Sequence, residues 1–579
     1  MELYNQVIES VVHPTAAWAT DLAAAHVQQR LGETATPDDW CDSLLNPKNR
    51  IDSLAPYPAA SWRVDGCSGL GTQFYAIPTF LRKLPPMRMD VFIPENQSPR
   101  IREQLDLAVA FHTKDGSRLS RLAAPNFIVR VLERWLKTDF ADHDDFEHFY
   151  TGIPFGSRIV FENLSLDVRQ VRVMMGLNHN LERQFMSLTT LTTLWLPAIE
   201  MPEMIDFFEL QVVKVLHDSV CLVDIRGELF IFKALTSDAK YLYHELKTLC
   251  ALEPHPNIIS RPRYIVQKHC KFGSKKAIIG FTTHHHAKGT IRDVLPALRA
   301  HGQLDASSQL KWSIQLAGAL EHLRFNAATY YPDLRLDNMV LSNDDNIVMV
   351  DFEQRGVWCE FAAPEVNAIE YLRLIATQED FPEDLKATYL EKLIAIFPEY
   401  EALQQDKYDN PKDGYNAAFL ALSPREQEAA EVYMLGRVLW CIFEGVSGPQ
   451  KAAVWQSYRW EPHLEFPEYE RCPDALRVLI DDCTKGRRAP LSQTVMRRKS
   501  QMVLQGDPDG EHQTAQNVIA AASTFWKSEV EFATSFLDNR TALKSTGEWN
   551  DNYFGRPTLR EVLGRLKDIQ EKIVNGEHV

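Results

Sequence analysis

Nowhere in its 579 residues does the chain contain an apolar run of the roughly 18 to 20 residues that a helix needs to cross a bilayer. Met1-Glu2-Leu3-Tyr4 is not the basic segment followed by an apolar one that begins a secretory signal. The nine cysteines are an odd number without CxxC spacing, which favours reduced thiols over a disulfide framework. These absences predict a protein of the cytoplasm or the nucleus that does not act at a membrane.

Basic residues are outnumbered, since 62 Lys and Arg stand against 78 Asp and Glu and give a net charge of −16. Nucleic acids and anionic membranes bind basic surfaces, so neither is expected as a partner. The densest basic cluster is Arg497, Arg498 and Lys499, joined loosely by Lys485, Arg487 and Arg488. Such short charge runs are usually solvated, so we expect a surface loop there.

The first 200 residues are expected to form a separate N-terminal domain, because the chain is too long for a single core. Helix and strand signals alternate here, which predicts a mixed α/β (α+β) structure. The signals are a helix start at Thr36-Pro37, a glycine-rich turn at 67–71, a strand over 107–112, a turn at 114–116 and a helix opened by Asn126 over 127–136. These residues contain no nucleophile–base pair, metal-ligand spacing or phosphate-binding loop, so no activity is assigned to this domain.

From about Phe207 the signals follow a fixed order that ends in a lysine and a carboxylate. Three strands are predicted over 212–216, 220–225 and 228–233, the first two joined by a tight turn at 217–219. A helix capped by Ser237 or Asp238 follows and carries Glu245 on its apolar face. A lysine that ends an apolar strand usually reaches water, but here the carboxylate can turn inward and pair with it. Lys233 and Glu245 are therefore candidates for a nucleotide clamp.

Three consecutive histidines, His284 to His286, follow Thr283. Successive side chains of an extended strand point to opposite faces, so adjacent histidines converge poorly on one metal ion. A linker whose backbone groups meet a flat heterocycle is the better interpretation.

Four polar residues downstream complete the set that phosphoryl transfer requires. A long helix over 309–325 precedes them, and a pair of strands leads to Asp351. Transfer of a phosphoryl group needs an acceptor for the hydroxyl proton, oxygen ligands for Mg²⁺ and cations near the moving charge. Asp333 can supply the first, and Asn338 with Asp351 the second. Lys233 and Arg335 can supply the third.

Over residues 205–572 the sequence resembles the eukaryotic protein kinase superfamily, as a divergent member. The matching motifs are Lys233 with Glu245, Tyr331 to Asn338 for the catalytic loop H-R-D-L-K-x-x-N, Asp351-Phe352-Glu353 for D-F-G, Ala363-Pro364-Glu365 for A-P-E, Glu431 to Trp440 for helix D-V-W-S-x-G-x-x-L-W and Arg556-Pro557-Thr558 for R-P-T. The resemblance implies an α+β, bilobal fold. It has a small β-rich lobe over 205–286 and a large helical lobe over 287–572, with insertions at 366–430 and 489–550.

The resemblance also implies ATP and Mg²⁺ as cofactors and assigns roles to the candidate residues. Lys233, held by Glu245, would bind the α- and β-phosphates. Thr283 falls at the gatekeeper position, and the backbone of His284 and His286 would meet adenine. By the same analogy, Glu365 and Arg556 would form a buried ion pair.

Several departures from the family pattern bear on activity. The turn at 217–219 has no glycine, so fewer backbone N–H groups would cover the phosphates. Pro332 replaces the catalytic-loop arginine that receives activation-loop phosphate, so that switch should be missing. Glu353 replaces the glycine of D-F-G and adds a carboxylate near the metal. Asp351 and Glu365 are only 14 positions apart, which is short for a peptide-docking platform.

The favoured interpretation is an ATP- and Mg²⁺-dependent phosphotransferase, by default a Ser/Thr protein kinase with a protein substrate. One alternative is a pseudokinase that binds or scaffolds without catalysis, which the missing glycine loop and Glu353 favour. Another is a kinase-fold enzyme that acts on a small molecule, which the short activation segment favours. The insertions, with a helix predicted over 385–397 and an exposed loop over 505–510, would either rebuild a substrate surface or serve packing or partner contacts.

Overall fold

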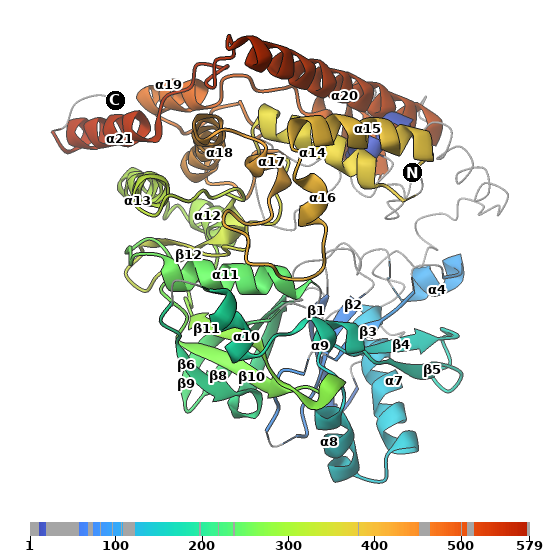
Figure 1. Cartoon of the computed structure of the whole chain (residues 1–579). Helices are drawn as coiled ribbons and strands as arrows, with labels where there is room; N and C mark the ends of the chain where they lie inside the picture. Colours follow the sequence, from blue (N-terminus) through green and yellow to red (C-terminus); the bar gives the residue numbers. More distant parts are fainter. Residues whose placement is uncertain are drawn as a thin grey trace.

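The protein has mixed α+β structure, with two sheets in one half of the molecule and most helices after residue 290 in the other (Figure 1). The structure is a computed structural model. It describes residues 11–18, 57–67, 73–81, 83–87, 89–94, 97–105, 107, 122–195, 199–217, 219–234, 238–379, 381–450, 462, 464–498, 501–506 and 514–575. Among these residues, no helix combines the length and the apolar character needed to span a membrane.

The first sheet has five strands in the order β1-β2-β3-β4-β5. Only β3 and β4 run parallel; the other neighbours are antiparallel. The elements of this region are η1 (Pro14–Trp18), β1 (Trp62–Cys67), β2 (Gln73–Pro78), β3 (Asp90–Phe92), α4 (Pro99–Gln104), α7 (Ala123–Asp139), α8 (His143–Gly152), β4 (Arg158–Glu162), β5 (Arg172–Gly176), α9 (His179–Gln184) and α10 (Leu188–Leu194).

Helix α7 is the helix predicted over 127–136, and it packs on β1. It begins at Ala123 rather than at Asn126, because Pro125 is tolerated in the first turn of a helix and does not end it. Asn126 instead donates from Nδ2 to the carbonyl of Leu122, 3.1 Å away. The other features predicted in this region, at 36–37, 68–71, 108–112 and 114–116, lie outside the described residues.

The second sheet has six strands in the order β6-β10-β11-β9-β8-β7, with β6 parallel to β10 and the others antiparallel. Arg226 and Gly227 both have positive φ and form the two-residue turn between β8 and β9. The strands predicted over 212–216, 220–225 and 228–233 are therefore confirmed. The elements are β6 (Glu203–Asp206), η2 (Phe207–Glu209), β7 (Gln211–His217), β8 (Val220–Ile225), β9 (Glu228–Lys233), α11 (Ala239–Ala251), β10 (Tyr264–His269), η3 (Phe272–Ser274) and β11 (Lys276–His284).

The helical half is built around α18, whose residues are buried on every side. A helix without a polar face belongs inside a core, and α13, α19 and α21 pack against it. The elements are α12 (Ile291–Ala300), α13 (Ala306–Phe325), η4 (Leu336–Asn338), β12 (Met339–Leu341), β13 (Ile347–Met349), α14 (Pro364–Thr377), α15 (Glu383–Ile396), α16 (Tyr400–Leu403), α17 (Ala417–Leu420), α18 (Pro424–Glu444), α19 (Asp474–Cys483), η5 (Leu491–Gln493), β14 (Val495–Arg498), β15 (Gln501–Leu504), α20 (Ala515–Thr546) and α21 (Leu559–Val574).

Both predicted insertions contain helices, and helices of the two insertions pack against each other. Helix α15 matches the helix predicted over 385–397 and lies against α14. The second insertion contributes the β14–β15 hairpin and α20, which also packs on α14 and on η1. Gln505 and Gly506 at the end of the hairpin are exposed, and the rest of the loop predicted over 505–510 lies outside the described residues.

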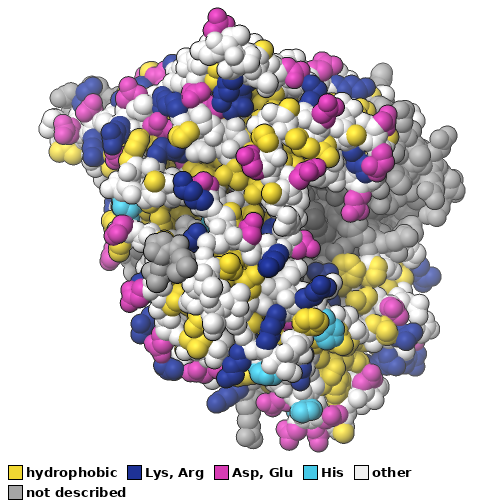
Figure 2. All heavy atoms as spheres, viewed as in Figure 1, with side chains coloured by type: hydrophobic (Ala, Val, Ile, Leu, Met, Phe, Trp, Pro, Cys, Tyr) yellow, Lys and Arg dark blue, Asp and Glu magenta, His cyan; other side chains and the backbone are white. Residues whose placement is uncertain are grey.

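The basic cluster near residue 498 is partly strand, not a loop throughout as expected. Arg497 and Arg498 belong to β14, because the hairpin with β15 continues through them, and Lys499 lies outside the described residues. The neighbouring arginines are paired with acids: Arg487 with Asp481 at 2.7 Å and Arg488 with Glu529 at 2.6 Å. Acidic and basic side chains are interspersed over the face of the molecule in Figure 2.

The two sheets share one continuous set of buried apolar side chains. Strand β6 begins the second sheet near the expected boundary at residues 200–205, and the core runs across it through Phe155, Phe207 and Phe232, whose rings contact in series. Polar contacts cross at the same place. Lys268 and Glu182 form a buried ion pair of 3.1 Å.

Candidate active site

Lys233 ends β9 in the centre of the second sheet, with β8 on one side and β11 on the other. Its ammonium group contacts three carboxylates: Glu245 at 2.6 Å, Asp351 at 2.5 Å and Glu353 at 3.0 Å. A glycine is required at position 280 of β11, because a Cβ there would collide with the carbonyl of Lys233 and the ring of Phe232. The structure thus confirms the expected pairing of Lys233 with Glu245 and adds two further carboxylates.

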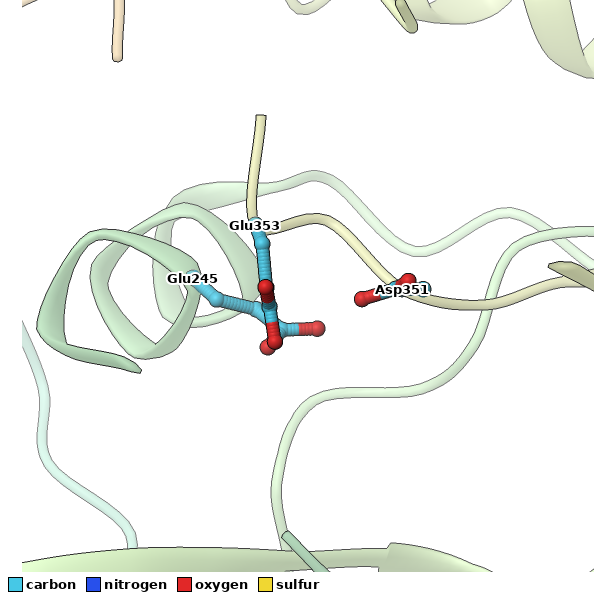
Figure 3. Close-up of side chains that lie close together, drawn as sticks. All are labelled: Glu245, Asp351 and Glu353. Atoms are coloured by element: carbon cyan, nitrogen blue, oxygen red, sulfur yellow. The ribbon is translucent and has the colours of Figure 1, made fainter. Parts of the chain in front are cut away.

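The three carboxylates come from two segments and converge (Figure 3). Glu245 projects from α11 and is buried, and its second oxygen accepts the N–H of Phe352 at 2.9 Å. Asp351 and Glu353 follow β13 and flank Phe352. Asp351 has a φ of 67°, a conformation that costs a non-glycine residue energy and persists where surrounding contacts fix it. One oxygen from each of the three lies within 4.8 Å of the others.

Burial and charge oppose each other in this cluster. Burial raises the pKa of Glu245 to about 7, although the nearby ammonium favours its charged form. Burial alone would lower the pKa of Lys233, but the carboxylates outweigh it and hold that pKa well above its ordinary value. Despite burial, Lys233 keeps the pKa of Asp351 below its usual range. Arg355 also pairs with Glu353 at 2.6 Å, so two cationic side chains face three carboxylates. One acidic group remains in excess, and its oxygens suit a hard divalent cation.

Asp333 lies in the loop between α13 and β12 and is held by two neighbours. Asn338 donates from Nδ2 to the backbone carbonyl and to Oδ2 of Asp333, both at 3.0 Å. The guanidinium of Arg335 lies 3.1 Å from the same carboxylate and 5.1 Å from the ring centre of Trp358. Burial raises the pKa of Asp333 to about 6 against the effect of Arg335. A carboxylate with such a pKa can accept a proton near neutral pH.

The carboxylate of Glu431, in α18, holds the loop that contains Asp333. Its Oε1 accepts the backbone N–H of Tyr331 at 2.8 Å, and its Oε2 accepts from Arg324 at 2.7 Å. The hydroxyl of Tyr331 donates to the carbonyl of Val350, and the N–H of Val350 donates to the carbonyl of Asn338 at 2.9 Å. These bonds join the loop with Asp333 to the segment with Asp351, so both groups belong to one site.

The residues expected to meet adenine lie at and after the end of β11. Thr283 pairs with Ile231 of β9 and is half-buried, as is His286, whereas His284 is exposed. The rings of His284 and His286 lie 5.0 Å apart. Burial, followed by the charge of the neighbouring histidines, lowers the pKa of His286 to about 4. Among the described residues, the metal-ligand cluster is the acidic one at Lys233, and it does not include the histidines.

Strand β7, at the edge of the second sheet, is hydrogen-bonded to residues of the N-terminal region. Asp65 accepts the N–H of Val215 at 2.8 Å, and Arg63 donates to the carbonyl of Val213 at 2.9 Å. His217 and Val220 pair across the glycine-free turn, whose carbonyl at Ser219 accepts the N–H of Ala234 at 2.9 Å. The pairing of β7 with β8 has register shifts between Val212 and Lys214 and between Val215 and His217, and residue 218 of the turn lies outside the described residues.

Glu365 and Arg556 form the buried ion pair that the sequence predicts. Two nitrogens of Arg556 meet the two oxygens of Glu365 at 2.5 and 3.0 Å. The same guanidinium donates to the carbonyls of Ala429 and Lys485 at 3.0 and 2.9 Å. One arginine therefore joins the starts of α14 and α21 to α18 and to the end of α19.

Sequence reasoning missed the contacts that Glu353, Gln354 and Glu431 make. Glu431 lies directly before the long apolar part of α18, and this was the available signal, since a buried carboxylate needs a partner. For Gln354 the sequence carries no comparable signal. Its partners are Thr329, Tyr330 and His244, distant in sequence.

Neither a protein-family model nor a curated protein sequence matches the chain. The chemistry of the site follows from its own residues. A buried ammonium can bind phosphate, carboxylate and amide oxygens can bind a hard cation, and Asp333 can take a proton from a hydroxyl.

Proposed function

We propose that residues 205–572 form a bilobal protein-kinase-like fold and that the protein is an ATP- and Mg²⁺-dependent phosphotransferase. The observation that carries the proposal is the joining of two groups of residues in one site. Lys233, Glu245 and Asp351 form one group, and Asp333 with Asn338 forms the other, linked through the hydrogen bond from Val350 to Asn338.

The residues fit both ATP and Mg²⁺. Lys233 would bind the α- and β-phosphates, because its ammonium already holds anionic oxygens at ion-pair distance. Asp351 and Asn338 would hold Mg²⁺ through oxygen, the ligand type that this ion prefers. The amide nitrogen of Asn338 is bonded to Asp333, which leaves its oxygen as the group to bind a cation. Bound Mg²⁺ would neutralise phosphate charge.

Asp333 would accept the proton of the acceptor hydroxyl, and Arg335 would offset charge on the γ-phosphate. We propose a Ser/Thr side chain of a protein as the acceptor, by the resemblance to protein kinases, with a small molecule as the second candidate because the segment from Asp351 to Glu365 is short. Pro332 carries no charge, so activity would not depend on phosphorylation of that segment. We place the protein in the cytoplasm or the nucleus, with neither nucleic acid nor membrane as a partner.

A pseudokinase scaffold is the second candidate function, and Glu353 favours it. Its carboxylate lies 3.0 Å from the Lys233 ammonium and would compete with phosphate for it. The glycine-free turn between β7 and β8 acts in the same direction, since it supplies fewer N–H groups to phosphates.

The test is the melting temperature with and without ATP and Mg²⁺, measured on the wild-type protein and on Lys233→Ala, Asp351→Ala and Asp344→Ala. At 100 times its Kd the nucleotide should stabilise the protein by about 2.7 kcal/mol. We expect the shift to need Mg²⁺ and to be lost in the Lys233 and Asp351 variants. Asp344 is an exposed aspartate of the β12–β13 turn, so its variant is the matched control and should keep the shift.

Two outcomes distinguish the phosphotransferase from the pseudokinase scaffold. A wild-type protein without a shift, together with a shift restored by Glu353→Gly, would refute the enzyme and support the scaffold. A wild-type shift with release of ADP in the presence of Ser/Thr peptides, abolished by Asp333→Asn, would support the enzyme.

A further inference from the structure

We infer that His244, Gln354 and the segment 403–416 of the first insertion are a positioning device, which holds α11 where Glu245 meets Lys233. The inference rests on the proposed role of that pair in binding nucleotide. It assigns a specific task to the first insertion, for which the sequence leaves several roles open, and to part of the N-terminal region, for which the sequence indicates none.

The first part of the device is one buried amide. Gln354 donates from Nε2 to the carbonyl of Tyr330 at 2.6 Å and to the hydroxyl of Thr329 at 3.1 Å. Its Oε1 lies 2.8 Å from Nε2 of His244. An amide oxygen only accepts, so the neutral imidazole must carry its proton on Nε2. His244 precedes Glu245, and Gln354 follows Glu353, so this amide joins α11 to the loop that leads to Asp333.

The second part is a backbone segment that covers this hydrogen bond. Gly414 has a φ of +81°, and a Cβ there would lie 2.8 Å from Nε2 of His244 and 2.9 Å from Oε1 of Gln354. The N–H of Tyr415 donates to the carbonyl of Gln354 at 3.2 Å, and the hydroxyl of Tyr330 donates to the carbonyl of Asp413 at 2.5 Å. Glycine is required at this position both for its backbone conformation and for the close approach.

The third part consists of the hydrogen bonds that Lys240 and Tyr243 of α11 make to neighbouring segments. Lys240 donates to the carbonyls of Leu403 and Gln405 at 2.9 and 2.8 Å. The hydroxyl of Tyr243 donates to the carbonyl of Ile278 at 2.8 Å and accepts the N–H of Met186 at 2.7 Å.

An aromatic contact connects this side of α11 to both neighbouring segments. The ring of Tyr243 lies 5.6 Å from that of Tyr408, whose hydroxyl accepts from the indole of Trp195 at 2.8 Å. The amide of Asn410 donates to the carbonyl of Leu194 at 2.6 Å. The insertion and the end of the N-terminal region therefore bind each other and α11 together.

These intramolecular contacts together fix the position of α11. Residues from β11, from the segment just before Tyr331, from the insertion and from the segment 186–195 all hydrogen-bond to α11 or to Gln354. The segment after Asp351 is anchored by the same insertion, since Asn416 donates to the carbonyl of Gly356 at 2.9 Å. Glu245 thus stays paired with Lys233 without an added phosphate or a separate activating subunit.

The test compares Gly414→Ala with Gly302→Ala by hydrogen exchange and by ATP binding. Both glycines have positive φ, so both substitutions strain the backbone, but a Cβ at Gly302 meets nothing within 4 Å. We expect amides of α11 and of Phe352 to exchange about tenfold faster in Gly414→Ala, as local opening becomes easier. Exchange in β1–β5 should stay at the wild-type rate. The Gly302 variant should match the wild type in α11 and at Phe352, with any change confined to the residues around position 302.

Gln354→Met, which keeps the length of the side chain but not its hydrogen bonds, is the second variant and should behave like Gly414→Ala. We also expect both variants to raise the KM for ATP about tenfold, the size of effect typical of losing a buried hydrogen bond. Wild-type exchange in α11 in both variants would overturn the inference. So would equal exchange increases in all elements, which indicate general destabilisation. Exchange is measured without nucleotide, so a wild-type protein that binds no ATP would refute the proposed function and leave this result intact.

Discussion

Removal of the Arg556 guanidinium should destabilise the helical half strongly, because the group is fully buried and bonded on every side. Arg556→Ala leaves the carboxylate of Glu365 buried without its partner and takes a donor from the carbonyls of Ala429 and Lys485. Breaking a buried pair in this way costs about 3 to 5 kcal/mol. At about 2 °C per kcal/mol, the lower end of the range for large domains, the melting temperature should fall by about 6 to 10 °C.

Differential scanning calorimetry of the wild type and three variants measures this effect. Arg560→Ala is the control, because Arg560 lies four residues away in an exposed pair with Glu321, and exposed pairs contribute less than about 1 kcal/mol. The double variant Arg556→Met/Glu365→Met should melt above Arg556→Ala, since it buries no lone charge. A melting temperature for Arg556→Ala within the range of the Arg560 control would refute the reasoning.

Two further predictions concern turnover. Burial raises the pKa of Asp333 to about 6, and the carboxylate accepts a proton only when it is ionised. The value of kcat/KM should therefore fall as the pH drops through about 6. ATP binding measured over the same pH range is the control, and a kcat/KM that does not change with pH would contradict the role of Asp333. Phosphatase treatment, verified by intact mass, should leave turnover within about twofold of the untreated protein because Pro332 cannot bind a phosphate, whereas a large loss would show that a phosphorylated residue is needed.

Local structure in the second sheet could be predicted from the sequence because its signals are local. Apolar strands separated by short polar turns predict β7, β8 and β9. The pairing of Lys233 with Glu245 was predictable for a related reason. A helix that follows a strand directly packs on the same sheet, so a carboxylate on its apolar face lies close to the end of that strand.

The other contacts of the site depend on residues far apart in the sequence. Asp351 and Glu353 reach Lys233 across more than 100 positions, and Gln354 reaches His244 across 110. Hydrophobic periodicity gives the faces of elements but not which loop crosses which helix. Gly414 illustrates the limit. Its sequence context is typical of any polar turn, whereas its real constraint is the imidazole and the amide that lie against it.

The expectation of a loop over the basic cluster Arg497 to Lys499 was wrong for a different reason. A run of like charges usually lies in solvent, but that tendency does not decide whether the backbone forms a loop or a strand. Val495 and Met502 are buried in a small apolar cluster with Val518 and Ala522 of α20, and the backbone pairing of the hairpin continues through Arg497 and Arg498.

Residues 11–18 make their contacts with a partner at the far end of the chain. Trp526 of α20 donates to the carbonyl of Val11, and Ser523 donates to that of Ala17, across 515 and 506 positions. On a ribosome that adds about 5 to 20 residues per second, about 25 to 100 s pass between the synthesis of residues 11–18 and that of their partners in α20. Residues 11–18 therefore cannot complete their packing until long after they are made. During that interval they are available to chaperones and proteases.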